Sequence, residues 1–402
     1  MDFEIIILGS DANAYYMARC VHEEYGKKAK VISAYPMSFT KHSNIVNLTC
    51  DDKLWNANTF ADSLNNYVKN VSASKIVCIS SNETYARNLV INKDKLDKRI
   101  TFNYVDLDFL DSLMMKDLFF KKFGDSGLLP KTIIYNLNDA LEIDFDFPVI
   151  IKPSNVIMFN HIDFPGKKKI YKLNNIEEVK TTINYFKNSE YNDTLIIQEY
   201  IPGDDSALHD SVVYCNSKGI CEFISFAQIG LQEHTSKMVG NAACLINGYT
   251  TNNYDKNVVL KFKEFMEKIN FKGLAEIDIK YDYRDQKYKI LEINARQGRC
   301  SYYVVKAGYN LVKYVVDDLI YNKKHDFKII DETVALSYVP KKIIKKYINN
   351  HEFKKEILKL YKEKKVVNPL YYKKDLPLKR ILFLIRKHFR YYKDYKNGYW
   401  KN

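Results

Sequence analysis

Features that would place the chain in a membrane or outside the cell are missing from its 402 residues. No run of about 18 apolar residues is free of charge, which excludes a typical transmembrane helix. The N-terminal segment has neither a basic stretch nor a long apolar one, so we expect no secretion signal. None of the seven cysteines is paired with another at the CxxC spacing of zinc or redox motifs. We therefore expect a cytoplasmic protein with reduced thiols.

Proline and glycine are also scarce, at 9 and 14 residues, which excludes a collagen-like or linker-dominated architecture. The net charge of +13 is unevenly spread. Residues 321–402 contain 23 Lys or Arg against 8 Asp or Glu, whereas residues 1–320 carry a net charge of −2. Because the basic excess is confined to the end of the chain, nucleic-acid binding along its whole length is not expected.

Strand and helix patterns alternate in the first hundred residues. Strands are predicted at 3–8, 30–33 and 75–80, with helices after the first and the third. Strands separated by helices indicate a parallel sheet, so the predicted fold class is α/β. Further along, we predict helices at 102–131, 176–186, 258–269 and 304–319, strands at 147–151, 194–200, 273–281 and 288–294, a hairpin over 211–227, and a loop over 155–169.

Oxygen-bearing side chains stand at alternate positions of the last predicted strand. Glu292 and Asn294 share one face of that strand, and Asp278 lies on a neighbouring strand. Two carboxylates and an amide oxygen suit Mg²⁺ that keeps water and phosphate oxygens as its other ligands. Arg296 extends the same face, where it would hold a transferring phosphoryl group or a substrate carboxylate.

Two lysines and a strand end upstream suit a nucleotide. Lys116 and Lys152 come from separate segments and act on phosphates as mobile point charges. Residues 197–203 read Ile-Gln-Glu-Tyr-Ile-Pro-Gly and offer backbone groups and an apolar wall to an adenine. Together with Asp278 and the Glu-Ile-Asn-Ala-Arg segment at 292–296, this ordered set resembles the ATP-grasp superfamily, and within it the carboxylate–amine ligases.

The resemblance covers about residues 1–320 and implies an ATP-grasp fold with a basic tail. The implied domains are a Rossmann-like domain at 1–105, a central lobe with a lid loop at 106–195, a C-terminal lobe with the magnesium site at 196–322, and a basic helical extension at 323–402. The implied nucleotide contacts are Lys116 and Lys152 on the ATP phosphates, Gln198, Glu199 and Ile201 around the adenine, and Asp205, or Asp204 in its place, on the ribose. The implied metal ligands are Asp278, Glu292 and Asn294, which would hold two Mg²⁺ ions, with Mn²⁺ as an alternative. Arg296 would stabilise the phosphoryl group.

The chain departs from the family pattern in two places. Residues 154–169, where many relatives have a glycine-rich lid, contain one glycine, Gly166. Glu276 stands where some dipeptide ligases have an arginine that acts in the transition state. We assign that role to Lys237, with a solvated loop lysine as the alternative.

The resemblance implies a reaction in which the γ-phosphoryl group moves to a carboxylate and an amine then attacks the acyl phosphate. Within the ligases, the Glu-Ile-Asn-Ala-Arg-Gln-Gly motif and the short lid look similar to the D-aspartate ligases, which extend a peptidoglycan precursor. Ligases that make other dipeptides, natural products or surface-polymer amides are an alternative. A non-catalytic nucleotide-binding scaffold is an alternative from a different class.

The extension at 323–402 mixes Leu, Ile and Phe with Lys and Arg, a composition typical of a helix at an anionic membrane surface. We expect it to bring the enzyme to the inner face of the membrane or to an anionic, lipid-linked substrate. The alternatives are a helical appendage packed on the core with a solvated basic face, and contact with nucleic acid.

Overall fold

The computed structural model describes residues 2–233, 235 and 240–398, and the chain forms two compact units. Unit 1 comprises Met1–Leu107, Asp204–Asp278 and Asn294–Asn402, and unit 2 comprises Asp108–Gly203 and Ile279–Ile293. Strands β14 (Gly273–Asp282) and β15 (Lys287–Asn294) contribute residues to both units. Because unit 1 is built from three stretches of chain, its core depends on contacts between residues far apart in the sequence.

The N-terminal part of unit 1 is the predicted parallel sheet, with strand order β3-β2-β1-β4-β5. Its strands are β1 (Phe3–Leu8), β2 (Ala29–Ser33), β3 (Val46–Cys50), β4 (Lys75–Ser80) and β5 (Ile100–Thr101). Its helices are α1 (Ala12–Tyr25), α2 (Ala57–Val68) and α3 (Glu83–Ile91). Ile5 and Ile7 pack with α1 on one face, whereas Ile6 and Leu8 pack with α2 and α3 on the other. The sheet is thus covered on both faces, as parallel sheets require.

A second sheet of nine strands forms the rest of the core of unit 1. Its main order is β15-β14-β10-β12-β13-β17-β18, with β11 paired to β10 and β16 paired to β11. The added strands are β10 (Leu208–Cys215), β11 (Cys221–Ser225), β12 (Ala227–Gln232) and β13 (Ala242–Asn247). The predicted hairpin is confirmed, since β10 and β11 are antiparallel with Val213 opposite Ile224. Helix α8 (Lys256–Lys268) matches the helix expected at 258–269.

Unit 2 contains a four-stranded antiparallel sheet with strand order β6-β9-β7-β8. Its strands are β6 (Thr132–Tyr135), β7 (Val149–Pro153), β8 (Tyr171–Leu173) and β9 (Leu195–Glu199). Its helices are α4 (Leu107–Met114), α5 (Lys116–Phe123), α6 (Val156–His161) and α7 (Ile176–Lys187). The loop predicted over 155–169 is therefore partly wrong, because Asn155 caps α6 by accepting a hydrogen bond from the N–H of Met158.

The structure has two helices where one was predicted over 304–319. Helix α9 (Tyr302–Lys306) ends before Gly308, whose φ of 105° is incompatible with a continuing helix, and α10 (Leu311–Leu319) begins after Asn310. Among the helices that the structure describes, none combines the length and the apolar character needed to cross a bilayer.

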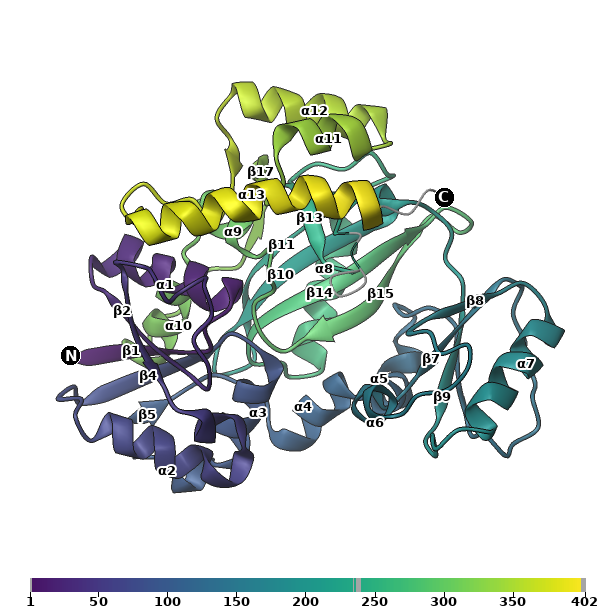
Figure 1. The fold of residues 1–402 in the computed structure, drawn as a ribbon, viewed down its shortest axis with the longest axis horizontal. Coiled ribbons are helices and arrows are strands. Elements are labelled where there is room, and N and C mark those ends of the chain that lie inside the picture. The colour runs from purple at the N-terminus through teal and green to yellow at the C-terminus, as the bar shows by residue number, and fades with distance from the viewer. Residues whose placement is uncertain (1, 234, 236–239, 399–402) are drawn as a thin grey trace. The chain divides into compact units, whose positions relative to one another are not determined.

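The basic tail is not helical throughout, because three short strands join it to the larger sheet. They are β16 (Lys328–Ile330), β17 (Val334–Ser337) and β18 (Val366–Val367). Strand β17 is antiparallel to β13 and parallel to β18. The tail helices are α11 (Lys341–Tyr347), α12 (His351–Lys362) and the long α13 (Leu378–Gly398), drawn in yellow in Figure 1. The prediction of a purely helical extension missed the strands, since their apolar runs are very short.

Helix α13 is fastened to the N-terminal half of unit 1 by a buried charge. Arg380 is fully buried, lies 3.3 Å from Asp375 and donates to the carbonyl oxygens of Phe39 and Leu370. Its guanidinium lies 3.6 Å from the centre of the Tyr15 ring. Asp375 accepts a hydrogen bond from the Tyr15 hydroxyl at 2.9 Å. The tail therefore belongs to the folded core.

We expect Arg380→Met to lower the free energy of unfolding by about 3–5 kcal/mol, because the substitution leaves the carboxylate of Asp375 buried without its cation. Chemical denaturation monitored by circular dichroism measures the loss. Arg390→Gln is the matched control, since Arg390 pairs with Asp394 while its own side chain is 78% exposed. Equal stability of the two variants would contradict the prediction.

Candidate functional site

In unit 2, Lys152 lies near the end of β7, beside Gln198 of the antiparallel strand β9. The Lys152 Nζ atom donates a hydrogen bond to Gln198 Oε1 at 3.2 Å, and the Gln198 amide donates to Thr132 Oγ1 at 3.0 Å. The pKa of Lys152 is lowered to about 8, mainly by burial and in addition by the charge of Lys116, whereas Glu292 opposes both effects. The surroundings of Lys152 thus favour its neutral form more than water does.

Lys116 is the first residue of α5 and belongs to the same group of charges. Burial lowers its pKa, Glu292 opposes that shift and Lys169 adds to it. Lys280 and Lys169 also lower the pKa of Lys152. Several ammonium groups of unit 2 therefore repel one another around the carboxylate of Glu292. An added anion would relieve this repulsion.

Glu199 follows Gln198 in sequence, and its carboxylate forms ion pairs. Its carboxylate accepts from Arg284 at 2.6 Å and from Lys289 at 2.9 Å, and both cations also bind Asp282. Its Oε1 atom also accepts from the backbone N–H of Lys131 at 2.9 Å. Burial raises the pKa of Glu199, but these contacts outweigh it and hold the pKa below its usual range. The side chain therefore ties β9 to the turn between β14 and β15.

In unit 1, Arg296 is the centre of a polar cluster. It donates to Glu276 at 3.0 Å and pairs with Glu83 at 2.7 Å, and Asn294 Nδ2 donates to Asp278 at 3.3 Å. Burial lowers the pKa of Arg296, but the two glutamates outweigh it and hold the pKa above its usual range. Its buried Nε atom has no hydrogen-bond partner among the described residues. A buried donor in this position suits one more acceptor.

Carboxylates crowd the strands next to this cluster. Asp210 of β10 accepts a hydrogen bond from the Tyr303 hydroxyl at 2.7 Å. Burial raises its pKa, and the negative charges of Glu276 and Asp278 raise it further. Such a set of oxygen atoms favours a cation.

The donor set predicted for magnesium consists of two carboxylates and one amide. Glu292 is exposed, and Asn294 lies two residues further along the same strand. Within the described part of the chain, no three His, Cys, Asp or Glu side chains are grouped as a metal site on their own. The hard oxygen donors present match Mg²⁺, which commonly takes only one or two carboxylates and completes its shell with water and phosphate.

The remaining predicted residues have defined places, with one exception. Ile201 is buried directly after β9. The Asp205 carboxylate accepts from the backbone N–H and from the side-chain amide of Gln232, both at 2.8 Å. Asp204 caps the short turn at 205–207. Lys237 lies outside the described residues.

Three charged residues of unit 1 were not singled out from the sequence as partners in such clusters. Glu83, which pairs with Arg296, lies more than 200 residues upstream of it. The Arg299 side chain is 12% exposed and pairs with Glu233, and the Tyr391 hydroxyl of α13 adjoins both side chains. The only sequence signal for this second pair is the position of Arg299, three residues beyond Arg296.

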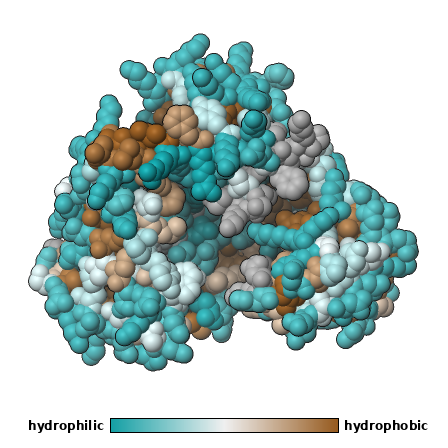
Figure 2. All heavy atoms as spheres, in the orientation of Figure 1, coloured by the Kyte–Doolittle hydropathy of each residue, from teal (hydrophilic) through white to brown (hydrophobic). Residues whose placement is uncertain are grey.

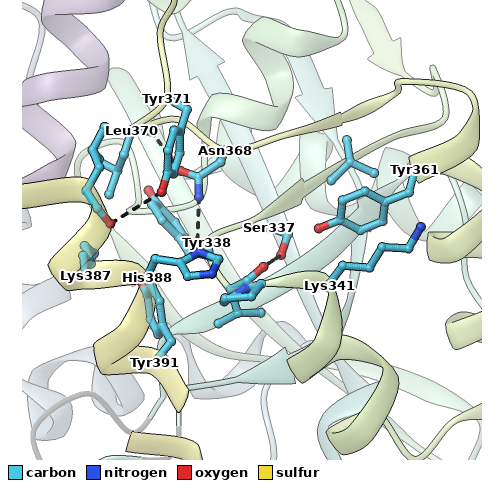
Figure 3. Close-up of a pocket in the computed structure, with 14 residues that line it drawn as sticks. Ser337, Tyr338, Lys341, Tyr361, Asn368, Leu370, Tyr371, Lys387, His388 and Tyr391 are labelled. Carbon is cyan, nitrogen blue, oxygen red and sulfur yellow. Dashed lines mark hydrogen bonds between the residues drawn. The ribbon is translucent and has the colours of Figure 1, made fainter. Parts of the chain in front are cut away.

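A cavity of about 270 Å³ lies among the tail residues of unit 1, and its lining residues do not include those predicted for the site. Figure 3 shows His388 near its middle, and the wall is held by hydrogen bonds from Asn368 to the carbonyl of Tyr338 and from Tyr371 to the carbonyl of Leu384. Its lining also includes Lys341, Tyr361, Lys387 and Tyr391. The wall is rich in aromatic side chains.

We expect Gly298→Ala to lower kcat for the implied ligase reaction by at least about tenfold. A methyl group at this position would overlap the Glu276 carboxylate and push it away from Arg296. Steady-state kinetics measures the effect, and a thermal unfolding curve separates it from loss of fold. Gly124→Ala is the control, because no atom lies within 4 Å of its added methyl group. An unchanged kcat for Gly298→Ala would refute the expectation.

Comparison with known proteins adds independent information. No family model matches the chain. The chain is 30% identical over 398 residues to a D-aspartate ligase of Enterococcus faecium (strain Aus0004), a match that covers 95% of this chain and 93% of the relative. Because so little of the chain is left uncovered, the match extends into the basic tail.

Solved structures share the fold at low sequence identity. The N5-carboxyaminoimidazole synthetase of Staphylococcus aureus has a TM-score of 0.61 at 13% identity, covering 87% of this chain and 89% of that protein. The L-amino acid ligase of Bacillus licheniformis has a TM-score of 0.55 at 12% identity, covering 79% and 74%. These likenesses confirm the predicted ATP-grasp fold. The chain therefore belongs to the D-aspartate ligase family of ATP-grasp carboxylate–amine ligases, which use ATP to form an amide bond and release ADP.

Proposed function

We propose that the carboxylate substrate is D-aspartate and that the amine belongs to a cell-wall precursor. The proposal rests on the D-aspartate ligase of Enterococcus faecium, which matches this chain over 95% of its length. The observation in the structure that supports the ATP-dependent chemistry is the group of lysines in unit 2, whose repulsion a polyanion such as a triphosphate would relieve.

In this proposal, Lys116 and Lys152 bind the phosphates of ATP. Support comes from the lowered pKa of both lysines, since a phosphate nearby would restore their full charge. Gln198, Glu199 and Ile201 line the adenine, with Glu199 acting through its backbone because its carboxylate already binds Arg284 and Lys289. Asp205 binds the ribose. To do so, its carboxylate must give up the hydrogen bonds that it accepts from Gln232.

Asp278, Glu292 and Asn294 are proposed to hold two Mg²⁺ ions, with Mn²⁺ as a substitute. The metal supplies charge neutralisation for the phosphoryl oxygens. The contribution of the chain is to place oxygen donors on the adjacent strands β14 and β15. The residues at 1–105, 106–195 and 196–322 serve as the three lobes of the fold.

Arg296 is proposed to hold the phosphoryl group or the acyl phosphate. Its unpartnered Nε atom supplies a donor, while Glu83 and Glu276 fix the orientation of the guanidinium. Lys237 is proposed as a second cation for the transition state. Together these residues would stabilise negative charge as the acyl phosphate forms and as the amine attacks it.

The basic tail is proposed to bring the enzyme to an anionic surface, either the inner face of the membrane or a lipid-linked amine substrate. Residues 321–402 supply 23 of the basic residues of the chain. Each Lys or Arg near an anionic bilayer contributes about 1 kcal/mol of attraction. This placement would make the protein peripheral to the membrane.

We expect the purified protein to release ADP when D-aspartate and an amine are both supplied, and Lys116→Met or Lys152→Met to lower kcat/KM for ATP by about a hundredfold. A coupled ADP assay over a panel of D- and L-amino acids measures both effects. Lys121→Met is the control, since Lys121 is an exposed residue of the same helix as Lys116. Release of ADP with a different amino acid, and not with D-aspartate, would move the assignment to another dipeptide or natural-product ligase.

We also expect ATP binding near pH 8 to take up protons. The pKa of Lys152 is about 8 without nucleotide, so part of the population is neutral, and a neighbouring triphosphate raises that pKa. Calorimetric titrations in two buffers with different ionisation heats measure the uptake. Lys152→Arg should lose it, because a guanidinium is fully charged at this pH. Equal binding heats in both buffers for the unchanged protein would contradict the expectation.

A further inference from the structure

Helix α13 exposes a line of large apolar side chains in addition to basic residues. The residues it buries against unit 1 are Arg380, Leu384, Tyr391 and Tyr395. The residues it exposes include Leu378 at 72%, Leu382 at 46%, Ile385 at 47% and Phe389 at 66%. A surface helix of a globular protein normally turns its large apolar side chains toward the core and leaves mainly charged and polar residues exposed. Packing of the helix against unit 1 therefore does not explain why these apolar side chains are exposed.

Specific bonds fix the inner face and prevent the helix from rolling. Arg380 is held by Asp375 and by two backbone carbonyls. The Tyr391 hydroxyl lies between Glu233 and Arg299, and the Tyr395 hydroxyl donates to the carbonyl of Gln232. Turning the apolar face inward would break these contacts and bury Lys and Arg residues. The fold thus holds the apolar face toward the outside.

The exposed apolar residues form one continuous line. Positions 378, 382, 385 and 389 are four, three and four residues apart, and at about 3.6 residues per turn they align along roughly 16 Å of the helix. We call this line the outer stripe. Figure 2 shows apolar atoms, in brown, gathered over the N-terminal half of α13. Leu376, 40% exposed, lies just before the helix and next to the stripe in sequence.

Basic residues border the outer stripe along the helix. At about 100° per residue, the neighbouring positions on one flank are the exposed residues Lys379, Arg386, Arg390 and Lys393. Asp394 is the one acidic residue within Leu378–Gly398. An apolar line with a cationic border matches an anionic bilayer, where aliphatic groups enter the acyl region and cations meet the headgroups. A second copy of the chain would bring two basic borders together, which like-charge repulsion opposes.

We propose that the outer stripe of α13 lies in the headgroup region of an anionic lipid bilayer, with the helix axis parallel to the membrane. This inference rests on the proposed membrane partner and names the face that meets it. Tyr391 and Tyr395 of the same helix form hydrogen bonds with Glu233, Arg299 and Gln232. The docked helix would therefore hold unit 1 through residues that are neighbours in sequence of Arg296 and Lys237.

The test compares vesicles of equal parts phosphatidylcholine and phosphatidylglycerol with vesicles of phosphatidylcholine alone, in a pelleting assay with the full chain. The stripe variant carries Leu382→Ser, Ile385→Ser and Phe389→Ser. The control carries Ile91→Ser and Ile220→Ser, which remove exposed apolar side chains (36% and 45%) elsewhere in unit 1. Point substitutions are used because deletion of the tail would remove β16–β18 from the core.

The full chain and the control should pellet with the anionic vesicles, and the stripe variant should bind them at least about tenfold more weakly. A second variant, Arg386→Gln with Lys393→Gln, should reduce the preference for anionic over neutral vesicles, and its binding should fall less steeply with rising salt than that of the full chain. Thermal unfolding and D-aspartate-dependent ADP release in solution should stay unchanged in the stripe variant, since its residues are exposed.

Each result that would contradict the proposal points to a different part of it. Absence of vesicle binding by the full chain overturns the membrane partner itself and the docking face with it, while leaving the ligase chemistry intact. Equal binding by the full chain and the stripe variant overturns the docking face alone. A dimer that light scattering detects for the full chain but not for the stripe variant, with vesicle binding unchanged, would make the stripe a contact between copies and also overturn the proposal.

Discussion

The repulsion among partly buried ammonium groups in unit 2 is the constraint on which the proposed chemistry depends. Lys152 and Lys116 are both partly removed from water, Lys116 lowers the pKa of Lys152, Lys169 lowers the pKa of both, and Glu292 opposes these shifts. Such an arrangement costs stability in the free protein, since desolvation penalises each charge. A polyanion among these lysines would offset that cost. In the proposed function the site is thus arranged for phosphate before phosphate binds.

A second principle, the pairing of buried charges over long sequence distances, organises unit 1. Arg296 is oriented by Glu83 and Glu276, and Arg299 by Glu233. Each guanidinium presents one nitrogen without a partner among the described residues, Nε in Arg296 and Nη1 in Arg299. For Arg296, whose proposed role is to hold the phosphoryl group, this fixed orientation would lower the reorganisation needed as negative charge develops.

Much of the candidate site could be predicted from the sequence, because the patterns that indicate it involve residues close together in the chain. The two-residue period of strands places Glu292 and Asn294 on one face, and the order of Lys116, Lys152 and the 292–296 segment is typical of the ATP-grasp pattern. The partners Glu83 and Glu233 were not accessible, because nothing near them in sequence indicates a contact with Arg296 or Arg299. Which side of helix α13 faces the core was not accessible for a related reason. Its composition is amphipathic, but only the fold reveals that Arg380 points inward and Phe389 outward. The strands of the tail are two to four residues long, too short for periodicity to detect.

The contact between Asp375, Arg380 and the N-terminal residues has a consequence for how the protein is made. Tyr15, Ser43 and the N–H of Asn44 all donate to Asp375, which is synthesised more than 300 residues after them. During synthesis these polar groups must stay hydrated or pair elsewhere until Asp375 is available, so this part of the core of unit 1 closes late. A nascent chain that has not reached Asp375 would consequently leave this part of the core open to chaperones and proteases.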